Sequence, residues 1–204
     1  LGNYVKRDPS ASLHWENLDM ACSFTNTSDE VGFIMNHVYI NEMSPKLIGG
    51  IHQAYSGDLK GLTTVYETIK EMNNRRRTMW SASNPKNYNN FRAFIMGIKG
   101  NDAIFGDGVV YEGCSPEPRQ YRGQTGAQDD IIPTMDIFSG VMGFYPDNML
   151  TKYLLDLRQY RPKCVQEFFT DLDAESPKML ENIKASGDVD AEIMLLGIVE
   201  QIYF

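Results

Sequence analysis

The amino-acid sequence predicts an all-α domain built from several helices and one long irregular loop. Apolar residues recur at helical spacing over most of the 204 residues. The clearest series consists of Leu150, Tyr153, Leu154 and Leu157. Only residues 108–111 have the composition of a strand, and one segment of that length cannot build a sheet. Residues 100–128 are rich in glycine and proline, and loops of such length in compact domains are usually functional or disordered.

The apolar pattern places the helices in the following order. They are expected over residues 31–55, 58–80, 85–99, 129–144, 147–160, 162–172, 177–185 and 188–204. The first should break or kink near Ser44 and Pro45, because proline has no N–H to donate within a helix. Asp58 and Asp147 stand where helix N-caps are expected.

Composition and charge limit the classes of function. A hydrophobic fraction of 42% predicts one globular domain, or the larger part of one. The net charge of −8 provides no basic field for a nucleic-acid backbone. The one compact basic cluster, Arg75 to Arg77, should lie in the last turn of a helix, where cations suit the helix dipole. We therefore expect no nucleic-acid partner.

Cysteine usage and hydropathy indicate where the protein works. Cys22, Cys114 and Cys164 are odd in number and form no CxxC pair, which favours a reduced cytoplasmic chain without structural zinc. No apolar run approaches the roughly 18 residues of a membrane span, and no signal peptide is recognisable. We expect a soluble protein without a membrane partner. Because the sequence begins at Leu1 and stops at Phe204 without a cap, we interpret it as a piece of a longer protein.

The segment YRGQTGAQDD, residues 121–130, raises the question of a phosphate-binding loop. It fits neither GxxxxGK[ST] nor GxGxxG. Asp129 and Asp130 suit the start of a helix but would repel a phosphate group. The pattern therefore favours a loop followed by an acidic helix N-cap.

Two polar residues lie on predicted apolar helix faces. Arg92 shares a stripe with Tyr88 and Ile95, and a buried guanidinium needs an anion because an unpaired buried charge costs several kcal/mol. That anion is either an acidic side chain of the chain itself or the carboxylate of a ligand. Alternatively, the Arg92 side chain snorkels and keeps its charge in water. His37 follows Phe33 by one turn, so it is either a hydrogen-bonded core histidine or a functional one. No HExxH or GxSxG pattern indicates a zinc protease or a serine hydrolase.

Five segments in order along the chain carry a family resemblance. They read KRDPSASLHWENLDMACSF, NPKNYNNFRAFIMGIKGN, DGVVYEG, PRQYRGQTGAQ and LLDLRQYRPKCVQEFF. Together they resemble the indoleamine 2,3-dioxygenase family. The resemblance implies an all-α haem-binding fold of the indoleamine and tryptophan 2,3-dioxygenase type. Residues 1–204 would form most of its large catalytic domain, while the small N-terminal domain and the helix with the proximal histidine would lie outside this chain.

The resemblance also implies an activity. Family members use haem b and dioxygen to cleave the indole C2–C3 bond of L-tryptophan, which gives N-formylkynurenine and begins the kynurenine pathway. Asn87 and Tyr88 differ from the adjacent phenylalanines of the family pattern. One alternative is therefore a haem-binding member with low tryptophan activity or another indole substrate. A second alternative is a non-catalytic module that binds haem or a small molecule.

The resemblance assigns roles to individual residues. Arg92 falls on the arginine that pairs with the tryptophan carboxylate, and Tyr88 on a phenylalanine of the substrate pocket. Phe33 lines the distal pocket beside haem and substrate, and Ile95 forms an aliphatic wall. The remaining substrate positions form the segment that closes over haem and substrate: Gly123, Gln124, Thr125 and Gly126. Thr125 matches a serine that reaches a haem propionate.

Histidine usage departs from the family pattern in two ways. His37 stands where the mammalian pattern has serine and resembles the distal histidine of tryptophan 2,3-dioxygenases. We therefore expect neutral His37 to accept a hydrogen bond from the indole N–H. None of His14, His37 and His52 matches the proximal iron ligand, which we expect beyond Phe204. Without that ligand, residues 1–204 alone would bind haem weakly or not at all and would lose catalysis.

Overall fold

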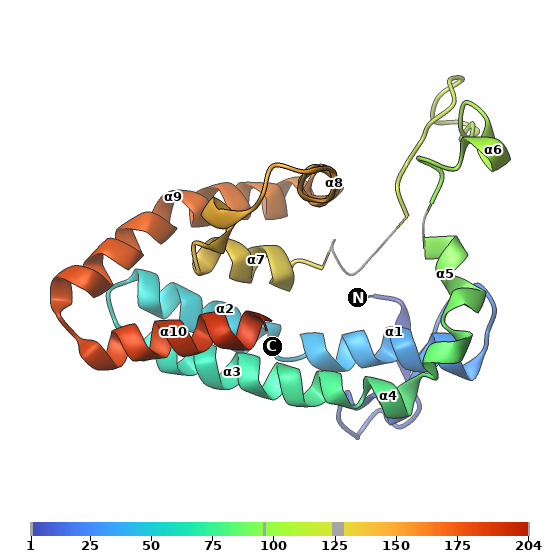
Figure 1. Ribbon diagram of the computed structural model, residues 1–204. Helices are drawn as coiled ribbons and strands as arrows, with labels where there is room; N and C mark the ends of the chain where they lie inside the picture. The colour runs from blue at the N-terminus through green and yellow to red at the C-terminus, as the bar shows by residue number, and fades with distance from the viewer. Residues whose placement is uncertain (1, 96, 124–128, 204) are drawn as a thin grey trace.

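Helices dominate the chain, which confirms the predicted all-α class. The computed structural model describes residues 2–95, 97–123 and 129–203 (Figure 1). Its longer helices are α1 (Ser28–Asn41), α2 (Ser44–Tyr55), α3 (Lys60–Arg77), α5 (Asn89–Ile95), α7 (Ile131–Phe138), α8 (Met149–Arg158), α9 (Lys163–Ser186) and α10 (Val189–Tyr203). Its shorter elements are α4 (Met79–Ala82), α6 (Asp102–Phe105), the 3-10 helices η1 (Trp15–Asn17), η2 (Pro85–Asn87) and η4 (Val141–Phe144), and the strands β1 (Tyr4–Lys6) and β2 (Leu18–Met20). None of the described helices is both long and apolar enough to cross a membrane.

The main core forms around α3. Leu62, Val65 and Ile69 repeat at helical spacing on one side of α3 and are buried. Helices α2 and α10 pack along α3, and α7 and α9 form a second layer on the same core (Figure 1). This packing connects the middle of the chain with its last helix.

The predicted break near residue 44 separates α1 from α2. Helix α1 ends at Asn41, and α2 starts at Ser44 with Pro45 in its first turn. The first N–H groups of a helix have no intrahelical partner, so proline is tolerated there. The two helices predicted over residues 31–55 and their break are therefore confirmed.

The predicted break between residues 172 and 177 is wrong. Helix α9 runs without interruption from Lys163 to Ser186 and contains Pro177. Its buried residues keep one helical stripe on both sides of the proline: Phe169, Leu172, Ser176, Met179 and Ile183. Burying these side chains in the core offsets the roughly 3 kcal/mol that an internal proline costs.

Glycines shorten two of the predicted helices. The helix expected over residues 85–99 is instead η2 followed by α5, and Gly97 lies just beyond it with a φ of 75°. The helix expected over residues 129–144 ends as α7 at Phe138, before Gly140 with a φ of 73°. Both glycines adopt the left-handed conformation that ends helices. At α8 the N-cap is Asn148 rather than the expected Asp147, and its side chain accepts from the Thr151 N–H.

A small hairpin before α1 was not predicted. Strands β1 and β2 pair antiparallel, with Val5 opposite Asp19. Leu18 of β2 is fully buried and packs with Met35 and Val38 of α1. Three-residue strands give too short an alternation for sequence periodicity to detect.

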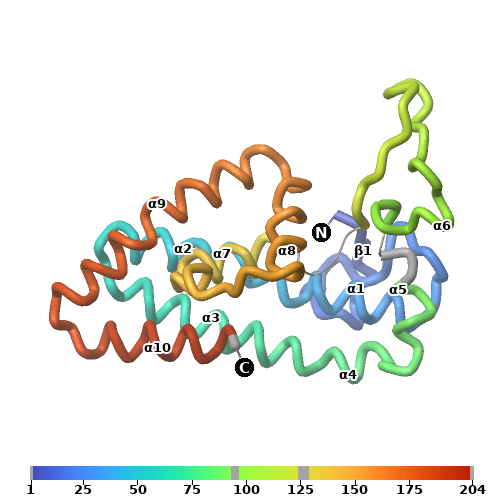
Figure 2. Tube along the Cα trace, turned by 45° about the horizontal axis from the view of Figure 1, so that its top comes forward, coloured from blue at the N-terminus to red at the C-terminus, as the bar shows by residue number. Residues whose placement is uncertain are grey.

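Residues 97–123 form an arm that projects from the helical body (Figure 2). At its base, the N–H groups of Ile98 and Lys99 both donate to the carbonyl of Tyr121, at 2.9 and 3.1 Å. Farther out, Val109 and Arg119 form an isolated antiparallel bridge, which is all that remains of the predicted strand at 108–111. The predicted irregular segment therefore has a closed base.

Candidate functional site

Aromatic side chains from α1 and α5 meet at one side of the helical body. The Phe33 ring lies 5.0 Å from the Tyr88 ring and 5.6 Å from the Phe91 ring, measured between centroids. The His37 ring lies 4.8 Å from Phe33. Phe91 is buried and anchors the group, whereas Phe33, His37 and Tyr88 are half-buried. The structure therefore brings together Phe33, His37 and Tyr88, which the family resemblance assigned to one pocket.

The hydrogen bond of His37 fixes its tautomer. Its Nδ1 atom lies 2.8 Å from the carbonyl oxygen of Phe33, one turn earlier in α1. A carbonyl oxygen only accepts, so Nδ1 carries the proton and donates. In the neutral ring Nε2 is then the acceptor, which is the form that an external N–H donor or a metal ion requires.

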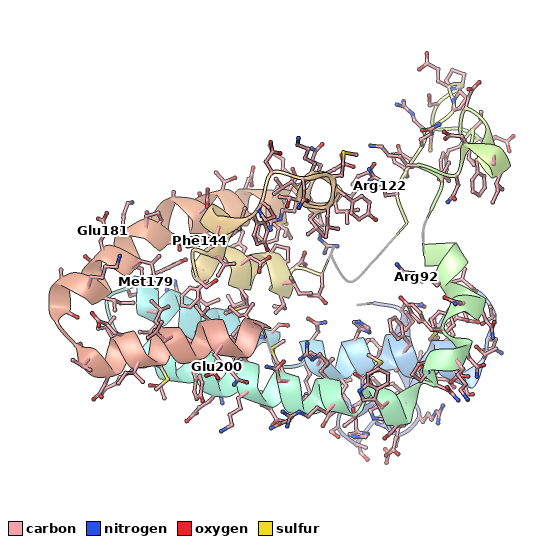
Figure 3. All side chains as sticks on the ribbon, viewed as in Figure 1. Arg92, Arg122, Phe144, Met179, Glu181 and Glu200 are labelled. Atoms are coloured by element: carbon pink, nitrogen blue, oxygen red, sulfur yellow. The ribbon has the colours of Figure 1, made fainter. Side chains whose placement is uncertain are left out.

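Arg92 is exposed, so the expectation that it lies on a buried face is wrong. The neighbouring Phe91 takes the buried position on α5 and turns Arg92 toward the outside. The Arg92 Nη1 atom donates to the Tyr88 hydroxyl at 2.6 Å, and the guanidinium lies 5.3 Å from the centre of the Tyr88 ring. Figure 3 shows the side chain extending away from α5. A phenol oxygen does not neutralise the positive charge, so Arg92 can still bind a carboxylate.

Glu30 holds the loop before α1. Its side chain is only 1% exposed. Its carboxylate accepts hydrogen bonds of 2.7 to 3.0 Å from the backbone N–H groups of Phe24, Thr25 and Asn26 and from the Thr25 hydroxyl. Burial alone would raise the pKa of Glu30, but these hydrogen bonds outweigh it and lower the pKa below its ordinary value. Glu30 thus fixes the first turn of the helix that carries Phe33 and His37.

The structure describes the residues on both sides of the predicted closing segment, Gly123 and Asp129. On the first side, Gly97 packs so closely on Gly123 that a Cβ at Gly97 would lie 1.9 Å from the Gly123 nitrogen. On the second side, the Asn41 amide donates to Asp129 at 2.7 Å and to the His37 carbonyl at 3.0 Å. Asn41 therefore links the start of α7 to the helix that carries His37. The predicted site residues Gln124, Thr125 and Gly126 and the side chain of Ile95 lie outside the described residues.

Sequence reasoning missed Glu30 and Asn41. Asn41 follows His37 by four residues and so lies on the same side of α1, which was the available signal. Its partner Asp129 lies 88 residues away, and no local pattern indicates that contact. Asp129 was expected to cap a helix, and its carboxylate does accept from the Ile131 N–H at 2.9 Å.

The three histidines have different environments. His14 caps η1 by accepting from the Glu16 N–H at 3.3 Å, and His52 is exposed on α2. Only His37, among the three, combines an aromatic surface with a free ring acceptor. Flat aromatic contacts, a cationic side chain and an imidazole whose Nδ1–H is held by a carbonyl are the groups that bind a haem or an aromatic acid. The described residues on this side of the body therefore carry groups that are chemically suited to contact a haem or an aromatic acid.

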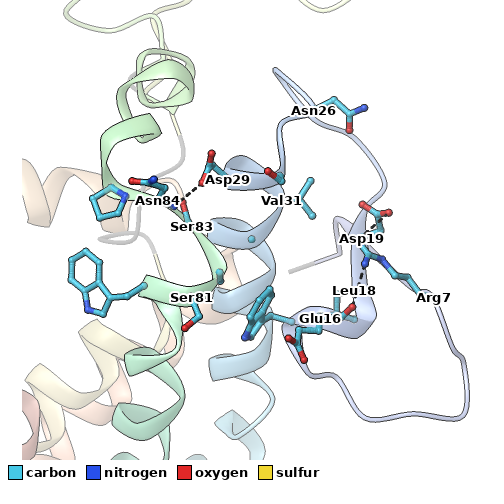
Figure 4. A pocket seen from close by; sticks show the side chains of 16 residues that line it. Arg7, Glu16, Leu18, Asp19, Asn26, Asp29, Val31, Ser81, Ser83 and Asn84 are labelled. Atoms are coloured by element: carbon cyan, nitrogen blue, oxygen red, sulfur yellow. Dashed lines mark hydrogen bonds and ion pairs between the residues drawn. The ribbon is translucent and has the colours of Figure 1, made fainter.

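A hollow of about 870 Å³ lies elsewhere, between the N-terminal hairpin, the first turns of α1 and residues 80–85 (Figure 4). Its lining includes Trp15 and Gly32 but none of the predicted site residues. Asp29 closes one edge by accepting from the Asn84 N–H at 2.6 Å. This hollow and the predicted site are separate features of the surface.

An all-α body with aromatic rings, an imidazole and a guanidinium on one side defines a helical protein equipped to bind a flat, acidic molecule. Residues 1–195 match the family model described as indoleamine 2,3-dioxygenase. The chain therefore belongs to the indoleamine 2,3-dioxygenase family.

Individual relatives agree with the family model. The chain is 29% identical to mouse indoleamine 2,3-dioxygenase 2 over 93% of its own length and 48% of the relative. It is 23% identical to rat indoleamine 2,3-dioxygenase 1, over 87% of this chain and 46% of the relative. It is also 26% identical to a protein of Haliotis madaka named myoglobin, over 68% of this chain and 36% of that protein. The chain spans about half the length of the mammalian relatives.

Proposed function

We propose that this chain forms the substrate-binding part of a haem-dependent dioxygenase that cleaves the indole C2–C3 bond of L-tryptophan to N-formylkynurenine. The observation that carries this proposal is the set of side chains on one side of α1 and α5. Phe33 and Tyr88 offer aromatic surface, His37 offers a ring acceptor, and Arg92 offers a positive charge. Tryptophan presents the complementary groups: a flat ring, an indole N–H and a carboxylate.

Arg92 binds the tryptophan carboxylate in this proposal. A planar guanidinium can donate two parallel hydrogen bonds to a carboxylate, which fixes orientation as well as affinity. The Tyr88 hydroxyl accepts from Nη1 and so restricts the guanidinium to one position. The ring of Tyr88 and the side chains of Phe33 and Ile95 then contact the indole.

His37 orients the indole ring. Because Nδ1 donates to the Phe33 carbonyl, Nε2 accepts from the indole N–H. This hydrogen bond selects indoles with a free N–H over those methylated at nitrogen. A site built to bond a donor rejects an analogue without it, because the acceptor is left unpaired.

Haem b, when bound, supplies the activation of dioxygen. Phe33 would lie beside haem and substrate, and the resemblance assigns Thr125 to a haem propionate. The proposal also assigns Gly123, Gln124 and Gly126 to the segment that would close over haem and substrate, where glycines would allow a close approach of the backbone. Residues 1–204 form most of the large catalytic domain of this enzyme.

We also propose a cytoplasmic location. Cys22, Cys114 and Cys164 are all exposed free thiols. Exposed unpaired thiols persist in reducing compartments. The test treats intact cells with a membrane-impermeant thiol reagent. If the reagent labels these cysteines, the cytoplasmic location is wrong.

The test uses the full-length protein, reduced and loaded with haem. With L-tryptophan, N-formylkynurenine should accumulate, and its absence at saturating tryptophan would refute the proposal. Replacing Arg92 with alanine should raise KM about 10- to 100-fold, as expected for a lost charged contact of about 1.5–3 kcal/mol. A parallel assay with other indoles distinguishes a member of different specificity, which would turn over one of them faster.

The His37 role has its own experiment. Replacing His37 with alanine should abolish discrimination between tryptophan and its N-methyl analogue. The Tyr88→Phe variant is the matched control, because it removes a hydroxyl bonded to Arg92 and not to the indole. Unchanged discrimination in His37→Ala would exclude His37 as the indole acceptor.

A haem carrier without turnover is the second candidate. An imidazole whose Nδ1 donates to a backbone carbonyl is the form in which histidine binds metals through Nε2. The relative named myoglobin also favours this alternative. In a carrier, His37→Ala should remove an axial ligand and change the haem absorption spectrum without tryptophan. In the dioxygenase, the haem spectrum of His37→Ala should match that of the unaltered protein without tryptophan and should differ from it only after tryptophan is added.

A further inference from the structure

The base of the arm is fastened to α8 by a single carboxylate. Arg122 Nε lies 2.6 Å from Oδ2 of Asp156, and Lys99 Nζ lies 3.3 Å from the same oxygen. The Arg122 guanidinium also lies over the ring of Tyr153, 4.5 Å from its centre. Figure 3 shows Arg122 where the arm passes α8. Asp156 therefore joins both strands of the arm base to one helix.

The two cations come from opposite strands of that base. Gly97 and Arg122 form an antiparallel bridge, and the next two N–H groups, of Ile98 and Lys99, donate to Tyr121. A carboxylate that binds one cation from each strand holds the strands together as well as holding them to α8. The Arg122 hydrogen bond, followed by Lys99, lowers the pKa of Asp156, so the group is ionised at neutral pH.

The arm base adjoins the proposed substrate site on both of its strands. Gly97 lies just beyond α5, the helix that carries Arg92. Arg122 immediately precedes Gly123, on which Gly97 packs too closely to admit a Cβ. A shift of the base relative to α8 must therefore move the end of α5 and Gly123 together.

Helix α8 is itself fixed to the body. Its Arg158 lies 3.8 Å from the buried carboxylate of Asp136 on α7. Just beyond α8, Arg161 forms an ion pair with Asp130, the residue before α7. Asp156 thus stands on a helix that is connected to α7 by ion pairs at and just beyond its C-terminal end.

We propose that Asp156 is a positioning residue of the substrate site, which holds Arg122 and Lys99 and thereby sets where α5 and Gly123 stand relative to the helical body. Asp156 acts through the arm base and does not contact substrate. This inference rests on the proposed function for its effect on tryptophan. Its effect on the arm base is independent of haem and substrate.

The test compares four variants of the full-length protein: Asp156→Ala, Arg122→Ala, the double variant and Asp156→Glu. Alanine is a good helix former, so Asp156→Ala should keep α8 folded. The matched control is Asp147→Asn, because Asp147 forms an exposed ion pair with Lys152 of the same helix. Exposed pairs of this kind contribute little.

Two readouts are required. Hydrogen exchange of the Ile98 and Lys99 amides, measured without haem or tryptophan, reports on the arm base. It should accelerate at least tenfold in both alanine variants. KM for tryptophan should rise about tenfold while kcat changes less than threefold, because a displaced α5 would weaken the charged contact of Arg92 with the carboxylate. The double variant should match the single ones, and Asp156→Glu should restore part of the affinity.

The outcomes separate the two hypotheses. Unchanged amide exchange in Asp156→Ala, or faster exchange with unchanged KM, would overturn the positioning role. An equal effect of Asp147→Asn would also overturn it, because general loss of α8 charge would then explain the result. If the unaltered protein does not bind tryptophan, the proposed function fails, and the amide exchange alone decides whether Asp156 positions the arm base.

Discussion

Replacing Glu30 with glutamine should destabilise the protein by about 3 kcal/mol. In the best orientation, the glutamine oxygen takes the place of Oε2, which accepts from the Thr25 N–H, the Thr25 hydroxyl and the Asn26 N–H. Each of these three bonds weakens by about 1 kcal/mol when the acceptor loses its charge. The amide NH₂ group then replaces the acceptor of the Phe24 N–H, which costs about 1 kcal/mol more. Relief from burying a charge offsets about 1 kcal/mol.

The assay is urea unfolding at pH 7, followed by thermal unfolding. For a chain of this size, 3 kcal/mol lowers Tm by about 6–12 °C. The control is Glu67→Gln, because Glu67 is exposed on α3 and its replacement should change stability by less than about 0.5 kcal/mol. A loss below about 1 kcal/mol for Glu30→Gln would refute the inference that the loop depends on this carboxylate.

The same substitution predicts a dependence on pH. The folded-state pKa of Glu30 lies below its ordinary value, so its stabilisation is fully present above the unfolded pKa and is lost as pH falls through the folded pKa. The difference in unfolding free energy between the unaltered protein and Glu30→Gln should therefore shrink below about pH 4.5. A difference that stays constant down to pH 3 would show that the charge contributes nothing.

Four further substitutions probe the packing. Gly32→Ala should lower the free energy of unfolding by more than about 2 kcal/mol, because its Cβ would lie 1.8 Å from the Ala82 carbonyl oxygen. Gly49→Ala should stabilise α2 by about 0.5–1 kcal/mol, because nothing lies within 4 Å of its Cβ position. Equal melting temperatures of these two variants would contradict the close contact of α1 with α4. Ser176→Ala should cost about 1–2 kcal/mol in urea unfolding, because the buried hydroxyl donates to carbonyls of α7 at 2.8 and 3.1 Å. Burial raises the pKa of Tyr55 to about 12, so the free energy of unfolding should fall as pH rises from 10 to 12. In Tyr55→Phe that fall should be smaller. An equal fall in both proteins would show that Tyr55 is not the group responsible.

Local periodicity was sufficient to predict most of the fold. It located α2, α3 and α10, whose apolar stripes meet in the main core, and α1, whose Met35 and Val38 pack with the hairpin. It also located α8, where Leu157 is buried. It failed at Pro177, where tertiary burial outweighs a local helix breaker. It also failed at the hairpin, whose strands are too short to show a period.

The candidate site was predictable only in part. Phe33 and His37 are one turn apart, so their contact follows from helix geometry. The exposure of Arg92 did not follow, because a stripe that includes residues 88, 91, 92, 95 and 98 is wider than the face that α5 buries, and Phe91 occupies that face. The contacts of Asn41 with Asp129 and of Arg122 with Asp156 join residues 88 and 34 positions apart, and they arise only from the packing of helices.

The position of α10 against α3 has a consequence for the order of folding. Helices α2 and α3 are neighbours in sequence, so their pairing closes only a short loop and can form early. The Asn73 amide, by contrast, bonds the carbonyl of Gln201 across 128 residues. The entropy of closing that loop must be overcome before α10 can pack on α3, where Gly197 lies against the Tyr66 ring. Until α10 docks, the part of α3 that it covers stays open to water, and exposed apolar surface of this kind favours aggregation during synthesis.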